Sequence, residues 1–231
     1  MEAYPTRTIA YICELFHPPQ QPPTEAIQKL HNRYFEDGNP PYSSFAVTPV
    51  GPVLSNPIMR PGALSQVAFL ADRIQFREEL GGLTCEDFGS RVAQIARDAA
   101  SITNIAAFPG QQVTIRSLIN PKQFTNSSLF MRDGLLGFGN AVEAFDTQPH
   151  ILGLRLVFPA TTENPGNSST LRIENYAQDA RSLYLENQAS FGMQVTSDGL
   201  GQLAPNVISA YEFLVNQAQT FVGAFDQRVE E

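Results

Sequence analysis

Residues 72–110 read DRIQFREELGGLTCEDFGSRVAQIARDAASITNIAAFPG and contain both kinds of element from which we expect the chain to be built. Residues 73–77 alternate between charged or amide side chains and the apolar Ile74 and Phe76. A period of two is typical of a β-strand with one buried face and one polar face. We therefore predict a strand over residues 73–79 that turns a polar face to water.

The second half of this stretch predicts a long amphipathic helix over residues 85–107. Thr84 precedes the helix as a cap, and Pro109-Gly110 ends it. The apolar residues recur at the helical period of about 3.6 residues, and they are Phe88, Val92, Ile95, Ala96, Ala99, Ile102 and Ala106. One face of this helix should therefore be buried.

Further strands and one further helix are expected before residue 120. The helix begins at Thr24, which we interpret as its N-cap, and ends near Gly38. Enrichment in β-branched and aromatic residues, bounded by prolines and glycines, predicts strands at 9–17, 45–47, 64–70 and 113–119. Residues 64–79 form either two strands or one long bent strand.

The same order of elements resumes in the second half of the chain. Residues 121–148 have weak periodicity and several glycines, so we expect a connector with at most short helical pieces. Beyond it, strands are predicted at 151–158, 171–176 and 183–187, after a polar turn. A long helix over 205–225 follows, opened by Pro205.

Two pairs of short segments indicate an internal repeat. DRIQFRE at 72–78 resembles DARSLYLE at 179–186 with one insertion, and IAAF at 105–108 resembles VGAF at 222–225. The alternative is that two unrelated halves share the same order of strands before a helix.

We therefore predict an α+β fold of two similar repeats, each with a long helix packed on a mainly antiparallel sheet. The first repeat would occupy residues 1–120 and the second residues 151–231, with a connector at 121–150. The two sheets would be either joined or face to face.

Pro23-Thr24-Glu25-Ala26 at the first helix and the strand Thr114–Asn120 carry a family resemblance. Together with the order of elements, they resemble a group of uncharacterised bacterial proteins with two α+β repeats. In that group the last strand usually carries Arg-Tyr-Ile-Asn and then a basic residue, whereas Ser117-Leu118 and Pro121 stand here. The resemblance implies the repeated fold and brings no known activity or ligand.

Composition excludes several classes of protein. Hydrophobic residues make up 42% of the 231 and charged residues 16%, which is the composition of a folded chain. A net charge of -8 argues against a nucleic-acid partner. The N-terminus lacks a signal peptide and no run of 18 apolar residues occurs, so we expect a cytoplasmic protein without a membrane span.

No catalytic residue, metal site or cofactor is predicted. Cys13 and Cys85 are too few for a zinc site and are interpreted as buried thiols. The isolated His17, His31 and His150 belong to no nucleophile motif. The glycines of 134–139 have neither dinucleotide nor phosphate-loop spacing and indicate a turn. Asp72, Glu78 and Glu79 favour a salt-bridged strand face over a general acid and base.

Polar strand faces are the most informative clue to function. Arg73, Gln75 and Arg77 line one such face, and Arg172 and Glu174 flank Ile173 in the same way. This pattern favours a non-catalytic binding or assembly protein that acts through a protein partner or through self-association. The alternative is a small-ligand-binding protein or an enzyme with a cavity between sheet and helices, lined by Glu78, Arg116 and Tyr184.

Overall fold

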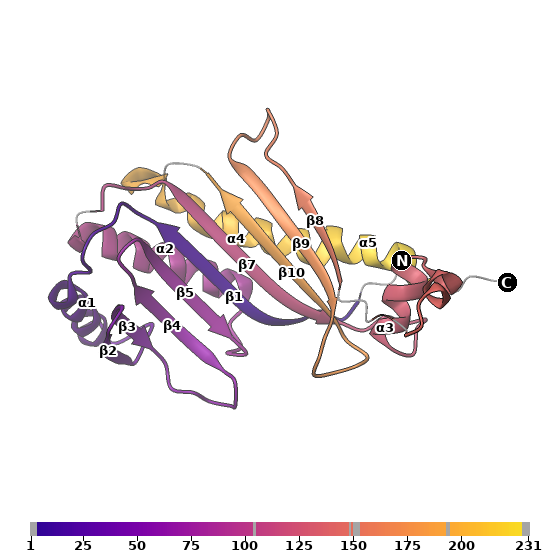
Figure 1. Ribbon diagram of the computed structural model, residues 1–231. Coiled ribbons are helices and arrows are strands. Elements are labelled where there is room, and N and C mark those ends of the chain that lie inside the picture. Colours follow the sequence, from indigo (N-terminus) through magenta and orange to yellow (C-terminus); the bar gives the residue numbers. More distant parts are fainter. Residues whose placement is uncertain (1–3, 104, 148, 150–152, 193–194, 228–231) are drawn as a thin grey trace.

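The computed structural model describes residues 4–227 except 104, 148, 150–152 and 193–194, and leaves out the side chains of 195–198. Its main feature is a nine-stranded antiparallel sheet whose helices lie on one side (Figure 1). The fold class is therefore α+β, as the sequence predicts.

The strands are β1 (Arg7–Phe16), β2 (Ser44–Thr48), β3 (Gly51–Ser55), β4 (Leu64–Phe69), β5 (Arg73–Glu79), β6 (Ala107–Phe108), β7 (Gly110–Ile119), β8 (Gly153–Phe158), β9 (Asn167–Asn175), β10 (Leu183–Phe191) and β11 (Val195–Thr196). The α-helices are α1 (Thr24–Glu36), α2 (Cys85–Thr103), α3 (Ser127–Leu129), α4 (Leu203–Glu212) and α5 (Gln219–Phe225). Two π-helical segments, η1 (Phe130–Leu135) and η4 (Phe213–Ala218), and two 3-10 segments, η2 (Gly139–Ala144) and η3 (Ser197–Gln202), complete the described part.

The large sheet has the strand order β2-β3-β4-β5-β1-β7-β10-β9-β8. Its centre is the pair of ten-residue strands β1 and β7. Outward from this pair, β5, β4 and β3 follow β1, whereas β10, β9 and β8 follow β7. The two halves of the chain are thus joined in one sheet rather than placed face to face. β8 is the first strand of the second predicted repeat, as β1 is of the first, but it lies at the edge of the sheet, where it pairs with β9.

Several strands extend beyond their predicted bounds, β9 and β10 by the most, and the described strands β3, β6 and β11 are not predicted from the sequence. β3 lies in the stretch that the sequence predicts as a proline-rich loop, because Pro52 argues against a strand there. Pro52 is the register partner of Val47 on β2, but it has no partner on β4, which pairs with β3 only from Val53 to Ser55. A proline is tolerated where a strand is paired on one side only. β9 begins at Asn167, inside the expected polar turn, and β10 continues to Phe191. The polar residues of these strand ends have low β-propensity, so the sequence does not predict them as strands. Pairing with distant parts of the chain stabilises them.

The first helices follow the predicted pattern with two corrections. Thr84 caps α2, since its Oγ1 accepts a hydrogen bond from the Asp87 amide at 3.1 Å. α2 ends at Thr103 rather than at residue 107, where the short strand β6 lies instead. Thr24 is not an N-cap: it is the first helical residue of α1, and Pro23 occupies the cap position without a side-chain bond.

The second long helix is confirmed over 203–225, although its middle third winds as the π-segment η4. Ile95 of α2 is fully buried, as the apolar stripe predicts, and Leu214 of η4 is fully buried too. Phenylalanines form much of this core, among them Phe76, Phe88, Phe108 and Phe130. No helix in the described part of the chain is both long and apolar enough to cross a membrane.

Both cysteines are buried and free, in agreement with the sequence analysis. Burial raises the pKa of each thiol to about 12. They are therefore uncharged core side chains at neutral pH.

Candidate functional site: the open face of the sheet

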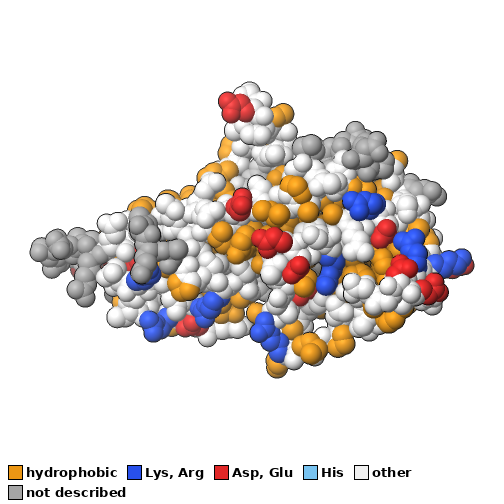
Figure 2. Space-filling view, turned by 180° about the vertical axis from the view of Figure 1, so that it is seen from behind, with side chains coloured by type: hydrophobic (Ala, Val, Ile, Leu, Met, Phe, Trp, Pro, Cys, Tyr) orange, Lys and Arg blue, Asp and Glu red, His pale blue; other side chains and the backbone are white. Residues whose placement is uncertain are grey.

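The side of the sheet that faces away from α1, α2 and α4 is called here the open face; it faces the viewer in Figure 1. Figure 2 shows the opposite side, where the helices form the surface and hydrophobic and charged side chains are mixed. Strand alternation sorts the residues of β5 between the two sides. Ile74 and Phe76 are buried under the helices, so Arg73, Gln75 and Arg77 lie on the open face.

One line of residues crosses the open face at right angles to the strands, and it is called here the charged row. Neighbouring members are direct register partners on neighbouring strands. From β8 to β5 the row consists of Arg155, Arg172, Glu186, Arg116, Ala10 and Glu79. Five of its six members are charged, so the register of six strands has aligned charges that are far apart in the sequence.

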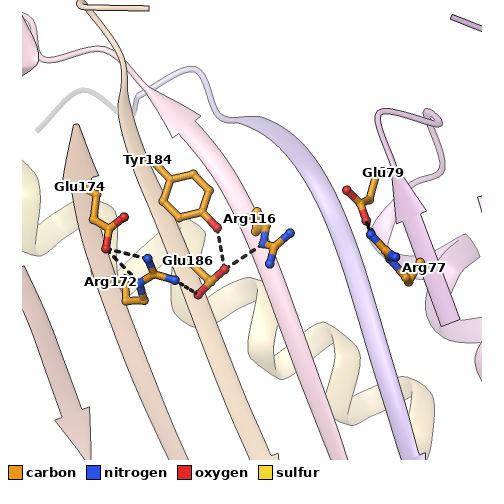
Figure 3. Close-up of polar contacts among 7 residues, drawn as sticks. All are labelled: Arg77, Glu79, Arg116, Arg172, Glu174, Tyr184 and Glu186. Atoms are coloured by element: carbon orange, nitrogen blue, oxygen red, sulfur yellow. Dashed lines mark hydrogen bonds and ion pairs between the residues drawn. The ribbon is translucent and has the colours of Figure 1, made fainter. Parts of the chain in front are cut away.

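Glu186 is the centre of this row (Figure 3). Its carboxylate accepts hydrogen bonds from Arg116 Nε at 2.8 Å, from Arg172 Nη1 at 2.9 Å and from the Tyr184 hydroxyl at 2.5 Å. Its side chain is only 7% exposed. Burial opposes ionisation, but the three hydrogen bonds outweigh it and hold the pKa of Glu186 below its usual value. Burial and the adjacent carboxylate raise the pKa of Tyr184, which therefore remains a neutral donor.

Ion pairs continue on both sides of this centre. Arg172 Nη2 lies 2.7 Å from Glu174, and Arg77 Nε donates to Glu79 at 2.8 Å (Figure 3). Each pair joins residues two apart on one strand, whose side chains point to the same face. Only half-buried, such pairs contribute little stability, about 0–1 kcal/mol. They make the open face polar and ordered without making it part of the core.

Two of the three candidate residues come together, and the third does not. Arg116 and Tyr184 share Glu186, on the open face. Glu78 is 4% exposed on the helix side of β5, where its Oε2 has no partner among the described residues. The three residues therefore do not line one cavity. The reason is local: Glu78 is two residues from Phe76 and must share its side.

Glu186 itself was not singled out from the sequence. The spacing Tyr184-Leu185-Glu186 places a hydroxyl and a carboxylate on one strand face, which is a usable signal. What the sequence could not provide is the pairing of Glu186 with Arg116, which is 70 residues away.

The other candidate groups have structural surroundings. The His17 ring is buried and its Nδ1 lies 2.9 Å from the carbonyl of Pro18. The His31 ring packs on Phe35 at a centroid distance of 4.9 Å. His150 lies outside the described residues. Within the described ranges, no group of three or more His, Cys, Asp or Glu side chains could hold a metal ion.

No protein-family model matches this chain, and no curated protein is similar to it in sequence.

Proposed function

We propose that the protein is a non-catalytic binding and assembly protein whose open face binds a second copy of the chain. The observation that carries this proposal is the charged row, which crosses six adjacent strands on a face that the helices leave uncovered. An antiparallel sheet with one packed side and one free side can accept a second layer on the free side.

The composition of the open face supports a protein partner. Between the bulge at Thr8 and Ala10 and the far strand ends, this face carries Arg73, Arg77, Arg116, Arg155 and Arg172 against Glu14, Glu79, Glu174 and Glu186. Its charge is 5 − 4 = +1, whereas the whole chain has -8. Arginine and tyrosine are enriched in protein interfaces, so the open face is less acidic than the chain as a whole and carries residues typical of an interface.

The charged row is complementary to itself when reversed. A two-fold axis parallel to the strands, between β7 and β10, would bring each member opposite a member of the second copy. Arg155 would then meet Glu79, Arg172 would meet Ala10, and Glu186 would meet Arg116. No like charges meet along the row. Isologous two-fold interfaces require this kind of self-complementarity.

Two arginines of the row have guanidinium N–H donors that no described residue of the same chain uses. Arg155 lies directly opposite Arg172, a like-charge pair that disfavours the sheet, and it makes no ion pair with any described residue. Arg116 uses only Nε toward Glu186, and its terminal nitrogens lie over the open face (Figure 3). Carboxylates of a second copy would satisfy both guanidinium groups.

The size of the open face also fits a stable interface. Six strands about 4.8 Å apart span about 24 Å, and strands of six to ten residues are about 20–33 Å long. Their product, about 480–800 Å², reaches the area that each partner buries in a typical specific complex.

We also propose that the two halves are repeats of one α+β unit, with the second unit beginning at β7 rather than at β8. The outward strand order from β1 and from β7, each half with its long helix, supports this division. The boundaries predicted at 120 and 151 would then separate β7 from the unit it opens. Residues 1–120 expressed alone should fail to melt cooperatively, because β7 would lose β10.

Sedimentation velocity over a range of protein concentrations tests the open-face proposal. We expect a dimer that dissociates with Arg155→Glu and with Glu79→Arg, because each places like charges opposite each other. The double variant Arg155→Glu/Glu79→Arg should dimerise again, since both charges of the pair are exchanged. Added salt should weaken the dimer.

Arg97→Glu is the matched control, because Arg97 is exposed on α2, on the helix side. It changes the net charge equally and should leave the dimer intact. A chain that sediments as a monomer at every concentration would overturn the proposal, as would a double variant that dimerises no better than the single ones.

A further inference from the structure

A pocket of about 360 Å³ lies between the β8–β9 loop, the adjoining ends of β9 and β10, and the helix α4–η4. It is separate from the charged row, and its lining includes Phe158, Asn167, Asn187, Phe191, Ser209 and Phe213. From this pocket we infer a binding site for a small neutral polyhydroxylated ring, of the monosaccharide or cyclitol class. This inference is independent of the open-face proposal.

Asn187 is the first reason to see a built site. It is 1% exposed and lies on the helix side of β10, where Leu185 and Ala189 are its apolar neighbours in the alternation. Its Nδ2 donates to the carbonyl of Ala210 at 2.8 Å. Because a carbonyl can only accept, this bond fixes the orientation of the amide and leaves Oδ1 as the free acceptor.

That acceptor has no partner among the described residues, and neither does the buried Oδ1 of Asn167. Both residues line the same pocket. Leaving a buried acceptor unsatisfied costs about 1–3 kcal/mol. Two such oxygens at one pocket indicate a ligand that donates at least two hydrogen bonds.

The helix wall of the pocket has unusual geometry. Phe213, which lines the pocket, is the first residue of the π-segment η4, and the ring of Phe158 meets it edge-on at 5.3 Å. π-segments within α-helices occur frequently at functional sites. The change of winding therefore coincides with the pocket that holds the unsatisfied acceptors.

The chemistry of the lining selects the ligand class. No described lining residue is charged, so the ligand should be neutral. Three hydroxyl-bearing side chains belong to the lining on the helix side, from Thr161, Ser169 and Ser209, whereas strand alternation turns the side chains of Ser168 and Ser190 to the open face. Hydroxyls both donate and accept, as those of a sugar do. The phenylalanine rings offer apolar surface to the C–H face of such a ring.

Ligand-observed saturation-transfer NMR with glucose, galactose, mannose and inositol tests the inference on the full chain. At least one of them should bind saturably with a Kd of about 1 mM or tighter, which corresponds to about -4.1 kcal/mol. Glucuronate, in which a carboxylate replaces the hydroxymethyl group of glucose, should bind at least tenfold more weakly than the neutral sugars.

Two variants and one control locate the site. Ser209→Trp should abolish binding, because the exposed Ser209 lies at the lining and an indole there fills the pocket. Asn187→Ala should weaken binding at least tenfold. Asn216→Trp, on the exposed side of η4 and outside the lining, should bind like the wild type.

Thermal melting of each variant checks that it is folded. Absence of saturable binding for all four neutral compounds overturns the inference. Equal binding of glucuronate, or undiminished binding by the folded Ser209→Trp variant, also overturns it. None of these results bears on dimerisation, which sedimentation measures separately.

Discussion

The two faces of the nine-stranded sheet each bury a carboxylate, and the two carboxylates differ in their hydrogen bonding. Glu186 on the open face is 5% exposed as a whole residue and accepts hydrogen bonds from three side chains. Glu78 on the helix side is 4% exposed and keeps Oε2 without a described partner. The open face is thus a polar network with its own internal order, whereas the helix side is an apolar core that tolerates one carboxylate at its edge.

This difference predicts that stability lies mainly on the helix side. Phe76 and Gln75 are neighbours on β5 that point to opposite faces, and Phe76 is fully buried. Phe76→Ala should cost about 3–5 kcal/mol of unfolding free energy. Gln75→Ala should cost less than about 1 kcal/mol, because it loses only a half-buried hydrogen bond to Glu14. Urea unfolding of the pair measures both, and similar losses would contradict the comparison.

The helix layer gives a second test of the same kind. Leu214 is fully buried within η4, two residues from the exposed Asn216. Leu214→Ala should cost about 2–5 kcal/mol in denaturant unfolding, through lost burial and the cavity left behind. Asn216→Ala is the control and should change stability by less than about 0.5 kcal/mol. A loss below about 1 kcal/mol for Leu214→Ala would mean that the layer can relax around the cavity.

On the open face the largest effect is expected at Glu186. Glu186→Gln keeps the shape but removes the charge that pairs with Arg116 and Arg172. We expect the free energy of unfolding to fall by about 1–3 kcal/mol. This is less than the loss expected for a fully buried ion pair, because both arginine side chains are about one-third exposed or more. Glu174→Gln, on the same face, should lose less than about 1 kcal/mol. An unchanged Glu186→Gln variant would show that the network contributes order but no stability.

The smallest expected effect is the pH dependence of that contribution. The pKa of Glu186 is held below its ordinary value of 4.5. A carboxyl group with a lowered folded-state pKa adds stability above the unfolded pKa and loses it as the pH falls through the folded one. The wild type should therefore exceed Glu186→Gln by a constant margin near neutral pH, and this margin should shrink below about pH 4.5. Chemical unfolding of both proteins from pH 7 to pH 3 measures it.

Much of the fold could be predicted because its signals are local. Ile74 and Phe76 against Arg73 and Gln75 identify β5 and assign its two faces, and the apolar stripe around Ile95 identifies α2. The prediction failed where local signals are misleading. β3 contains a proline, and the start of β9 consists of polar residues.

The candidate site was predictable only in part. Arg116 and Tyr184 are predicted to line a cavity between sheet and helices, whereas in the structure both lie on the open face and are joined by Glu186, which the sequence does not point to. Glu78 was grouped with them because sequence distance does not reveal which strands become neighbours. Its own alternation with Phe76 already placed it on the other side.

The sequence alone thus determined the strongly periodic elements, such as α2 and β5, and which side of each is apolar, because these properties repeat within one element. Only the tertiary structure decided that Arg155, Arg172, Glu186 and Arg116 form one row, and that Asn167 and Asn187 share a pocket. Both depend on the register between strands. A shift by one residue would move every side chain of a strand to the other face, and that register is fixed by packing contacts between distant parts of the chain.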